Sequence, residues 1–365
     1  MSGRIAVSLP RTRTAIVQGE NGVLSIQNGL PLPAVPSDRI LVKVHWVAIN
    51  PCDWKMPARF PTPGCVVGCD FAGTVVAVGS QVAKVGRVQV GNRVCGAVHG
   101  ANPIEKSTGT FSDYVVADGD LVWLIPPYMS FQEATVAASG VILDTLGLVF
   151  KTSLCLPGTF DQPATGDDSK EVLVYAASTA VGTAATHLLK LLGHKPIGVC
   201  SPKNYELVRS YGAVEVFDYH SPTCAADIRA FTKNGLAYAI DPIVEAKTMQ
   251  LCYSAMGRAG GRYSALEAYS EELCTRKVVK PDLVIGMRCF GRKVALDFGY
   301  ESEGNPQDRA LGIEWRDEVQ KLLDEGKLKA HPIKVLPGRY EEILKGLEML
   351  KSKQVSGYKL VVQLA

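Results

Sequence analysis

The chain has 365 residues, enough for two domains with separate hydrophobic cores. Hydrophobic residues make up 47% of it and charged residues 21%, which is typical of an α/β protein. The formal net charge of +3 comes from scattered basic residues, and no apolar run reaches about 18 residues, so we expect neither a nucleic-acid partner nor a membrane span.

The N-terminal sequence and the cysteine distribution indicate in which cellular compartment the protein works. Ser8, Pro10 and three arginines interrupt the apolar stretch that a signal peptide would need. The ten cysteines are dispersed and mostly lie in apolar strings, as buried thiols do in a reducing compartment. Cys65 and Cys69 are the only close pair, and no second pair completes a zinc site. We therefore expect a cytoplasmic protein, and we expect it to be a monomer.

The first 150 residues are rich in predicted β-strands. Strands are expected at 39–50, 73–80, 86–96 and 109–118, because alternating or continuous apolar residues are bounded there by glycine turns. Many short strands of this kind indicate a barrel-like domain.

A helix is predicted over 130–150, with Ser130 as its N-cap and Glu133 three residues later, which is the pattern of a capping box. The following stretch, 154–171, is rich in Pro, Gly, Asp and Thr, and we expect it to be an exposed insert.

From residue 172 the pattern alternates between strands and helices. Strands are expected at 172–176 and 196–200, and helices at 182–192 and 204–211. Further strands are expected near 214–217, 237–243, 261–265 and 283–287. This alternation predicts a doubly wound parallel sheet.

The C-terminal segment is predicted to contain helices at 314–325 and 340–352 and to end in a strand at 358–364. We expect this strand to complete the N-terminal barrel, so that the catalytic domain is discontinuous. The expected domains are 1–150 with 310–365, and 151–309 between them.

The segment 172–193 reads as a strand, a tight turn and a helix, the arrangement that binds a dinucleotide pyrophosphate. Its turn, AASTAVG (176–182), has Ala177 and Ala180 where the usual motif has glycine. Small residues still allow close approach, and Ser178 and Thr179 add hydroxyl donors.

The next strand ends in VCSPKN (199–204) without the acidic residue that binds the ribose diol of NAD. A hydroxyl at Ser201 and an ammonium at Lys203 suit the additional 2′-phosphate of NADPH. We therefore expect NADPH as the cofactor, with its 2′-phosphate held by Ser201, Lys203 and Asn204 and covered by Tyr219, and with Pro202 as a further cofactor contact.

Eight motifs together resemble the medium-chain dehydrogenase/reductase superfamily, and within it the trans-acting enoyl reductases of fungal polyketide synthases, of the lovastatin enoyl reductase type. They are VAINPCDWKM (47–56), GCDFAGTVVAVGS (68–80), GTFSDYVVA (109–117), VLVYAASTAVGT (172–183), CSPKN (200–204), GAVEVFDY (212–219), MGRAGGRYSAL (256–266) and VSGYKLVV (355–362). The resemblance implies a GroES-like β-barrel catalytic domain and a Rossmann domain.

The resemblance also implies a zinc-free enzyme. Zinc-dependent members bind the catalytic metal through a Cys three residues before an Asp and through the His of a GHE motif; here those positions are Asn50, before Asp53, and Cys69. Without a Lewis acid, alcohol dehydrogenation is disfavoured, and we expect hydride delivery to an alkene conjugated to a carbonyl.

The resemblance assigns further site residues. Lys55 and Asn50 are the catalytic candidates. The alternative is that Lys55 braces the cofactor ribose and that Asn50 caps a loop, without either taking part in catalysis. Cofactor contacts are expected from Cys52, Asp53, Trp54, Lys55, Ser178, Thr179, Ala180, Val181, Ala265, Leu266, Val355 and Ser356.

For the acyl chain, the resemblance points to two segments, 143–148 and 286–290. Their residues are Leu143, Asp144, Thr145, Leu146, Gly147, Leu148, Gly286, Met287, Arg288, Cys289 and Phe290. The chain departs from the family here, since Leu143 and Asp144 stand as an insertion in a GISTAGL-like run. Packing in a core helix accounts equally well for the leucines.

The expected function is reduction of an α,β-unsaturated polyketide thioester, carried by the acyl carrier domain of a polyketide synthase or a synthase–peptide synthetase hybrid. An acidic carrier could dock on Arg276, Lys277, Lys280 and Arg288, although these could also be solvated loop residues. The alternatives are a free-standing NADPH quinone or enone reductase and a non-catalytic synthase scaffold, which an intact phosphate pocket argues against.

Overall fold

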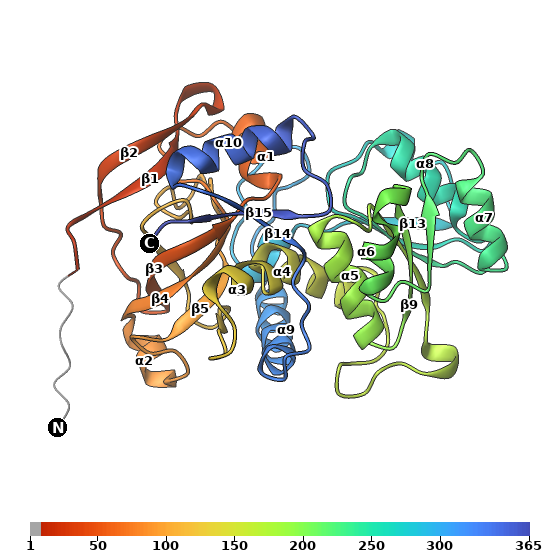
Figure 1. Cartoon of the computed structure of the whole chain (residues 1–365), viewed down its shortest axis with the longest axis horizontal. Coiled ribbons are helices and arrows are strands. Elements are labelled where there is room, and N and C mark those ends of the chain that lie inside the picture. Colours follow the sequence, from red (N-terminus) through yellow and green to blue (C-terminus); the bar gives the residue numbers. More distant parts are fainter. Residues whose placement is uncertain (1–8) are drawn as a thin grey trace.

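The computed structural model describes residues 9–365, which form two large sheets with helices around and between them (Figure 1). The first sheet has seven strands and lies on the left in Figure 1. Its strands are β3 (Arg39–Ala48), β4 (Asp70–Val78), β5 (Arg93–Ala97), β6 (Tyr114–Asp118), β7 (Trp123–Leu124), β14 (Ile333–Leu336) and β15 (Lys359–Gln363). The order is β14-β15-β3-β4-β5-β7, with β6 also paired to β3.

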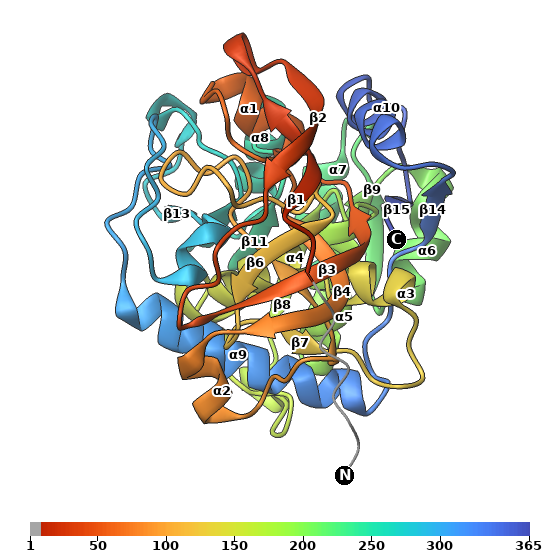
Figure 2. The ribbon, with the colours of Figure 1, turned by 90° about the vertical axis from the view of Figure 1, so that its left-hand side faces the viewer.

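The N-terminal sheet is antiparallel except where β14 runs parallel to β15. Figure 2 shows its central strands, β3 and β4, side by side. A separate hairpin of β1 (Thr12–Gln18) and β2 (Leu24–Pro31) lies next to helix α1 (Cys52–Arg59). The expected GroES-like antiparallel domain is confirmed, although the strands expected at 73–80, 86–96 and 109–118 have different bounds.

The second sheet has six parallel strands in the order β10-β9-β8-β11-β12-β13, as the alternating sequence pattern predicts. The strands are β8 (Glu171–Tyr175), β9 (Lys195–Cys200), β10 (Glu215–Asp218), β11 (Tyr238–Asp241), β12 (Gly261–Ala265) and β13 (Val279–Leu283). The helices between them are α5 (Ala180–Leu191), α6 (Tyr205–Ser210), α7 (Cys224–Phe231) and α8 (Ala246–Ala255). The Rossmann fold is confirmed.

One strand of this sheet was predicted wrongly. The expected strand at 283–287 is instead β13, which ends at Leu283, and Gly286–Phe290 form a short 3-10 helix. The sequence of β13 contains Lys280, Pro281 and Asp282, which are not typical of a strand, so the pattern did not indicate one here. Proline is tolerated because β13 lies at the edge of the sheet.

The helix expected at 130–150 is two helices, α3 (Phe131–Ala137) and α4 (Gly140–Leu148), followed by a π-turn at Val149–Ser153. The capping box of Ser130 and Glu133 is confirmed. The stretch Phe131–Ser153 has the length and hydropathy of a membrane span, but 89% of its apolar window is buried, as in the core helix of a folded domain.

The C-terminal segment returns to the first sheet. Helix α9 (Pro306–Asp324) packs on α4, where Trp315 donates a hydrogen bond of 2.8 Å to the Leu143 carbonyl. Helix α2 (Ser80–Val85) lies beyond the end of β4, and helix α10 (Tyr340–Lys351) packs next to β14 and β15. Strand β15 pairs antiparallel with β3, so that Val361 lies opposite Ala48. The prediction for the terminal strand is confirmed, whereas the domain bounds at 150 and 310 stay a prediction.

Candidate functional site

A cavity of about 440 Å³ lies between the two sheets. Its wall comes from elements beside both sheets. Helices α1 and α4 lie on the side of the first sheet, and the turn after β8, the residues after β11 and β12 and the 3-10 helix at 286–290 lie on the side of the second. The segment 355–360, which enters β15, completes the wall. We call this space the interdomain cavity.

The turn after β8 is built to bring backbone close to a ligand. Ala176 has a φ of 50°, and Thr179 caps α5 by accepting a hydrogen bond from the Gly182 amide at 3.1 Å. A Cβ on Gly182 would lie 2.4 Å from the Ala176 carbonyl oxygen, so this turn requires glycine there. Residues 178–181 line the cavity at the N-terminus of α5, where amide groups favour an anion.

The residues expected around a 2′-phosphate gather next to this turn. The Asn204 amide lies 3.2 Å from the Ser178 hydroxyl, 3.4 Å from that of Ser201 and 3.3 Å from that of Ser356. Three segments that are far apart in the sequence therefore meet at Asn204. Lys203 is exposed and makes no ion pair with any residue from 9 to 365.

None of the residues expected around the 2′-phosphate, Ser201, Pro202, Lys203, Asn204 and Tyr219, lines the interdomain cavity itself. Pro202 is exposed at the start of the short helix Pro202–Asn204. Tyr219 is 41% exposed, and its ring centroid lies 6.3 Å from that of Tyr175. The Tyr219 ring also packs on the ring of His220, with 4.0 Å between the two centroids.

Lys55 crosses the cavity to the other domain. Its Nζ lies 2.6 Å from Oε1 of Glu267, which follows β12, and Glu267 also accepts hydrogen bonds from Arg59 at 3.3 Å and from Tyr300. Burial acts to raise the pKa of Glu267, but hydrogen bonds from Lys55 and Tyr300 outweigh it and hold this pKa below its usual value. Glu267 is therefore ionised, and Lys55 is oriented by a charged partner.

Asn50 is occupied within the protein. Its Nδ2 donates to Oδ2 of Asp70 at 2.8 Å, its Oδ1 accepts from the ammonium group of Lys359, and its backbone amide donates to Asp53 at 2.7 Å. These contacts fit the loop-capping alternative and leave one amide hydrogen for a ligand at most.

Sequence reasoning missed the buried polar cluster to which Asn50 belongs. Asp70 is fully buried and accepts hydrogen bonds from Ser139 at 2.5 Å and from the Val141 amide at 3.0 Å. The ammonium group of Lys359, which lines the cavity and is only 5% exposed as a residue, lies 3.8 Å from Asp70. The signal available in the sequence was a lysine directly before the apolar run LVV in the strand YKLVVQL.

His331 is a second wall residue that sequence reasoning missed. Its Nδ1 lies 2.9 Å from the Thr183 hydroxyl. Burial, followed by the charge of Lys359, lowers the pKa of His331 to about 4, so this ring is neutral at physiological pH.

The expected substrate residues divide between the cavity wall and the core. Asp144, Thr145, Gly286, Met287 and Phe290 line the cavity. Leu143, Leu146, Gly147, Leu148, Arg288 and Cys289 do not.

The residues away from the wall have other contacts. Leu143, Leu146 and Leu148 lie in the core shared with α9, and a Cβ on Gly147 would lie 2.7 Å from the Trp315 ring. Arg288 pairs with Asp308 at 2.9 Å. Core packing therefore accounts for the leucines, as the alternative proposed. Met56, Phe60, Val141, Ile142, Ile285 and Leu296 add apolar wall that the sequence did not indicate.

The expected cofactor residues divide in the same way. Cys52, Lys55, Leu266, Val355 and Ser356 line the cavity, whereas Asp53, Trp54 and Ala265 lie behind the wall. Asp53 and Ala265 are buried, and burial raises the pKa of Asp53 to about 7.

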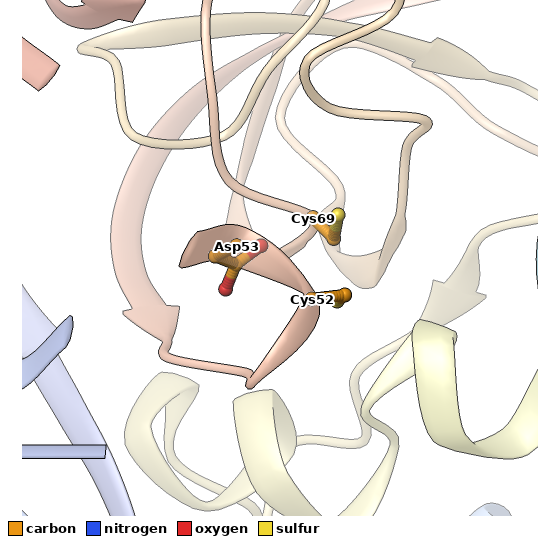
Figure 3. A group of neighbouring side chains, drawn as sticks. All are labelled: Cys52, Asp53 and Cys69. Atoms are coloured by element: carbon orange, nitrogen blue, oxygen red, sulfur yellow. The ribbon is translucent and has the colours of Figure 1, made fainter. Parts of the chain in front are cut away.

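Cys52, Asp53 and Cys69 form a group whose sulfur and oxygen atoms lie within 4.8 Å of one another (Figure 3). Zinc could bind here only if two thiols and a carboxyl lost their protons. A hydrogen bond with Cys52, together with burial, raises the pKa of the Cys69 thiol well above its usual value. Asn50, which stands where zinc-dependent relatives have a cysteine ligand, accepts a hydrogen bond from the ammonium group of Lys359. A cation beside Asn50 disfavours a second one, so these residues do not fit a catalytic zinc.

Comparison with known proteins identifies the family. Residues 36–127 match the alcohol dehydrogenase GroES-like domain family, and residues 180–272 match the zinc-binding dehydrogenase family. Trans-enoyl reductase ffsC of Aspergillus flavipes is 62% identical over 356 residues, covering 98% of this chain and 97% of the relative. Trans-enoyl reductase phmE of Phaeosphaeria nodorum is 60% identical over 359 residues, with the same two coverages of 98% and 97%.

Solved structures support the fold alone. The CurK enoyl reductase is similar with a TM-score of 0.75 and 20% identity, covering 97% of this chain and 99% of that one. The quinone oxidoreductase from Coxiella burnetii has a TM-score of 0.69 and 20% identity, covering 97% and 100%. With two full-length relatives at 60% identity or more, the chain belongs to the trans-enoyl reductases, a group within the medium-chain dehydrogenase/reductase superfamily.

Proposed function

We propose that this trans-enoyl reductase uses NADPH to reduce an α,β-unsaturated polyketide thioester, while the acyl chain stays on the acyl carrier domain of a fungal polyketide synthase or synthase–peptide synthetase hybrid. The observation that carries the proposal is the interdomain cavity, which joins a phosphate-binding turn to an apolar chamber. We also propose that the enzyme works as a monomer in the reducing cytoplasm, consistent with ten free cysteines.

The preference for NADPH rests on the end of β9. The strand ends in VCSPKN, which contains no carboxylate. Ser201 and Asn204 lie within hydrogen-bonding distance of each other. Lys203 between them is exposed and forms no ion pair with any residue from 9 to 365. A carboxylate there would repel a 2′-phosphate, whereas an ammonium group and hydroxyls stabilise it.

Each part of the cavity has a distinct task in this proposal. NADPH, when bound, supplies the hydride for the β-carbon of the enoyl group. The turn at 178–181 binds the pyrophosphate, and the pair of Lys55 and Glu267 fixes the two domains against each other at the cavity. Apolar residues such as Met287, Phe290 and Leu296 exclude water from the acyl chain.

A comparison of three acceptors tests the proposed reaction. NADPH oxidation should be fastest with an enoyl thioester of pantetheine, slower with a free enone, and slowest with a quinone. A quinone that outruns the thioester would instead favour a quinone reductase, and no turnover with any acceptor, despite NADPH binding, would favour a scaffold.

We propose that turnover needs no metal, because Asn50 is bound to Asp70 and Lys359 and Cys69 stands in place of a histidine. Elemental analysis of active protein should give less than one zinc per ten chains, and prolonged treatment with a chelator should leave the rate unchanged. A chelator that abolishes turnover, with recovery on adding zinc, would contradict this.

Of the four basic residues on which an acidic carrier domain was expected to dock, two are engaged within the protein. Arg276 donates to the backbone carbonyls of Met256 and Gly257 at 2.9 and 2.7 Å, and Arg288 pairs with Asp308, so neither is free for a partner. Lys277 and Lys280 remain exposed at the sheet edge formed by β13.

The double substitution Lys277→Glu and Lys280→Glu should therefore lower the rate with a carrier-bound enoyl chain several-fold, because carrier domains are acidic around their arm. The rate with a short pantetheine thioester, which has no carrier, should stay the same. Equal slowing of both substrates, or of neither, would exclude docking at this edge.

A further inference from the structure

Asp144 is an acidic side chain in an apolar part of the cavity wall. It lies on α4, whose sequence is GVILDTLGL, and it is 5% exposed. It forms no ion pair with residues 9–365, and its polar side-chain neighbour is the Cys289 thiol. A carboxyl group in such surroundings has no evident structural task, which is unusual for a buried acid.

The surroundings of Asp144 favour its protonated form. Thr145 beside it donates to the Val141 carbonyl, Arg288 is turned to Asp308, and the charged groups that act on Asp144 from β4 and β6 are the carboxylates of Asp70 and Asp118. Burial raises the pKa of Asp144 to about 8, against a lowering effect of the Cys289 thiol. At neutral pH, Asp144 is therefore a neutral acid facing the cavity.

The proposed reaction needs such an acid. When hydride adds to the β-carbon, the C=C electron pair moves towards the thioester oxygen and leaves an enolate, which must take up a proton at the α-carbon. A positioned acid with a pKa near the working pH is suited to that transfer.

Four other proton-bearing groups on the wall already have hydrogen-bond partners. Lys55 and Tyr300 donate to Glu267, and Lys359 donates to Asn50. His331 is neutral and bonded to Thr183. Asp144 lacks a comparable acceptor among residues 9–365.

We propose that Asp144 is a catalytic residue that donates the proton to the α-carbon after hydride transfer, an inference that rests on the proposed function. The O–H bond of Asp144 breaks, the enolate electron pair forms the new C–H bond, and the thioester carbonyl is restored. Asp144 is left as a carboxylate and regains a proton from water when the product has left the cavity.

The test uses the 2-methyl-2-butenoyl thioester of pantetheine with NADPH, because its product has a new stereocentre at the α-carbon. The wild-type protein should give one epimer, since Asp144 reaches the enolate from one wall. Asp144→Asn, which keeps the shape but has no acidic proton, should turn over about 100-fold more slowly. Water should then protonate both faces, so that the two product epimers approach equal amounts, while NADPH binds as tightly as before.

Asp308→Asn is the matched control, since Asp308 is a buried carboxyl that contacts the same 286–290 segment but does not line the cavity. It should give a single epimer at a rate within threefold of wild type. Asp144→Ala, checked by its melting temperature, serves as a second variant if the amide disturbs folding. A variant at Asp144 that keeps a single epimer, whether fast or slow, would overturn the assignment. A wild-type protein that reduces quinones but not the thioester would instead overturn the proposed function.

Discussion

Lys359→Met should lower the free energy of unfolding by about 3–5 kcal/mol, the cost of removing one partner of a buried charge pair. Lys359 donates to Asn50 and lies 3.8 Å from Asp70, whose other contacts are neutral donors from Ser139, Val141 and Asn50. Without the ammonium, Asp70 would be a buried carboxylate without a cation. Urea unfolding measures the change.

Lys43→Met is the matched control for this substitution. Lys43 lies on the neighbouring strand β3 but is exposed, so its loss should change the unfolding free energy by less than about 0.5 kcal/mol. Equal stability of the two variants would mean that Lys359 does not compensate Asp70. Asp70→Asn in the Lys359→Met background should recover part of the loss, because it removes the uncompensated charge.

Lys203→Ala should weaken NADPH binding by about 1–3 kcal/mol, which is about 5- to 150-fold in Kd, and should leave NADH binding unchanged. Lys203 is exposed next to the Asn204 cluster, and within residues 9–365 no carboxylate pairs with it, so its charge is available to a 2′-phosphate. Fluorescence titration with both cofactors measures the difference.

The control for this variant is Lys195→Ala. Lys195 is exposed at the opposite end of the same strand, β9, and its loss should affect neither cofactor. Parallel weakening of NADPH and NADH by Lys203→Ala would refute a 2′-phosphate contact, since only NADPH carries that group.

The sequence predicted the elements whose signals are local. The capping box of Ser130 and Glu133 and the apolar runs at 172–176 and 196–200 each depend on neighbouring residues, and the structure confirms them. Helix α9 was predicted to begin at 314 but begins at Pro306, because its first turn, PQDR, is polar and shows no apolar periodicity.

The site was harder to predict because its key contacts join distant residues. Asp70 and Lys359 are far apart in the sequence and meet only because β15 pairs with β3, which in turn pairs with β4. The motif around 143–148 indicated the right helix but not its face. Asp144 and Thr145 turn to the cavity, whereas Leu146 packs into the core, and only the contact with α9 decides which side is which.

Deuterium transfer tests directly whether one cavity brings the nicotinamide of NADPH against an enoyl thioester. The protein is supplied with NADPH deuterated at C4 and with crotonyl-pantetheine, and the product is examined by NMR. We expect one deuterium at the β-carbon, one solvent proton at the α-carbon and an intact thioester. A product without deuterium at the β-carbon, or deuterium transfer to a quinone but not to the thioester, would contradict this expectation.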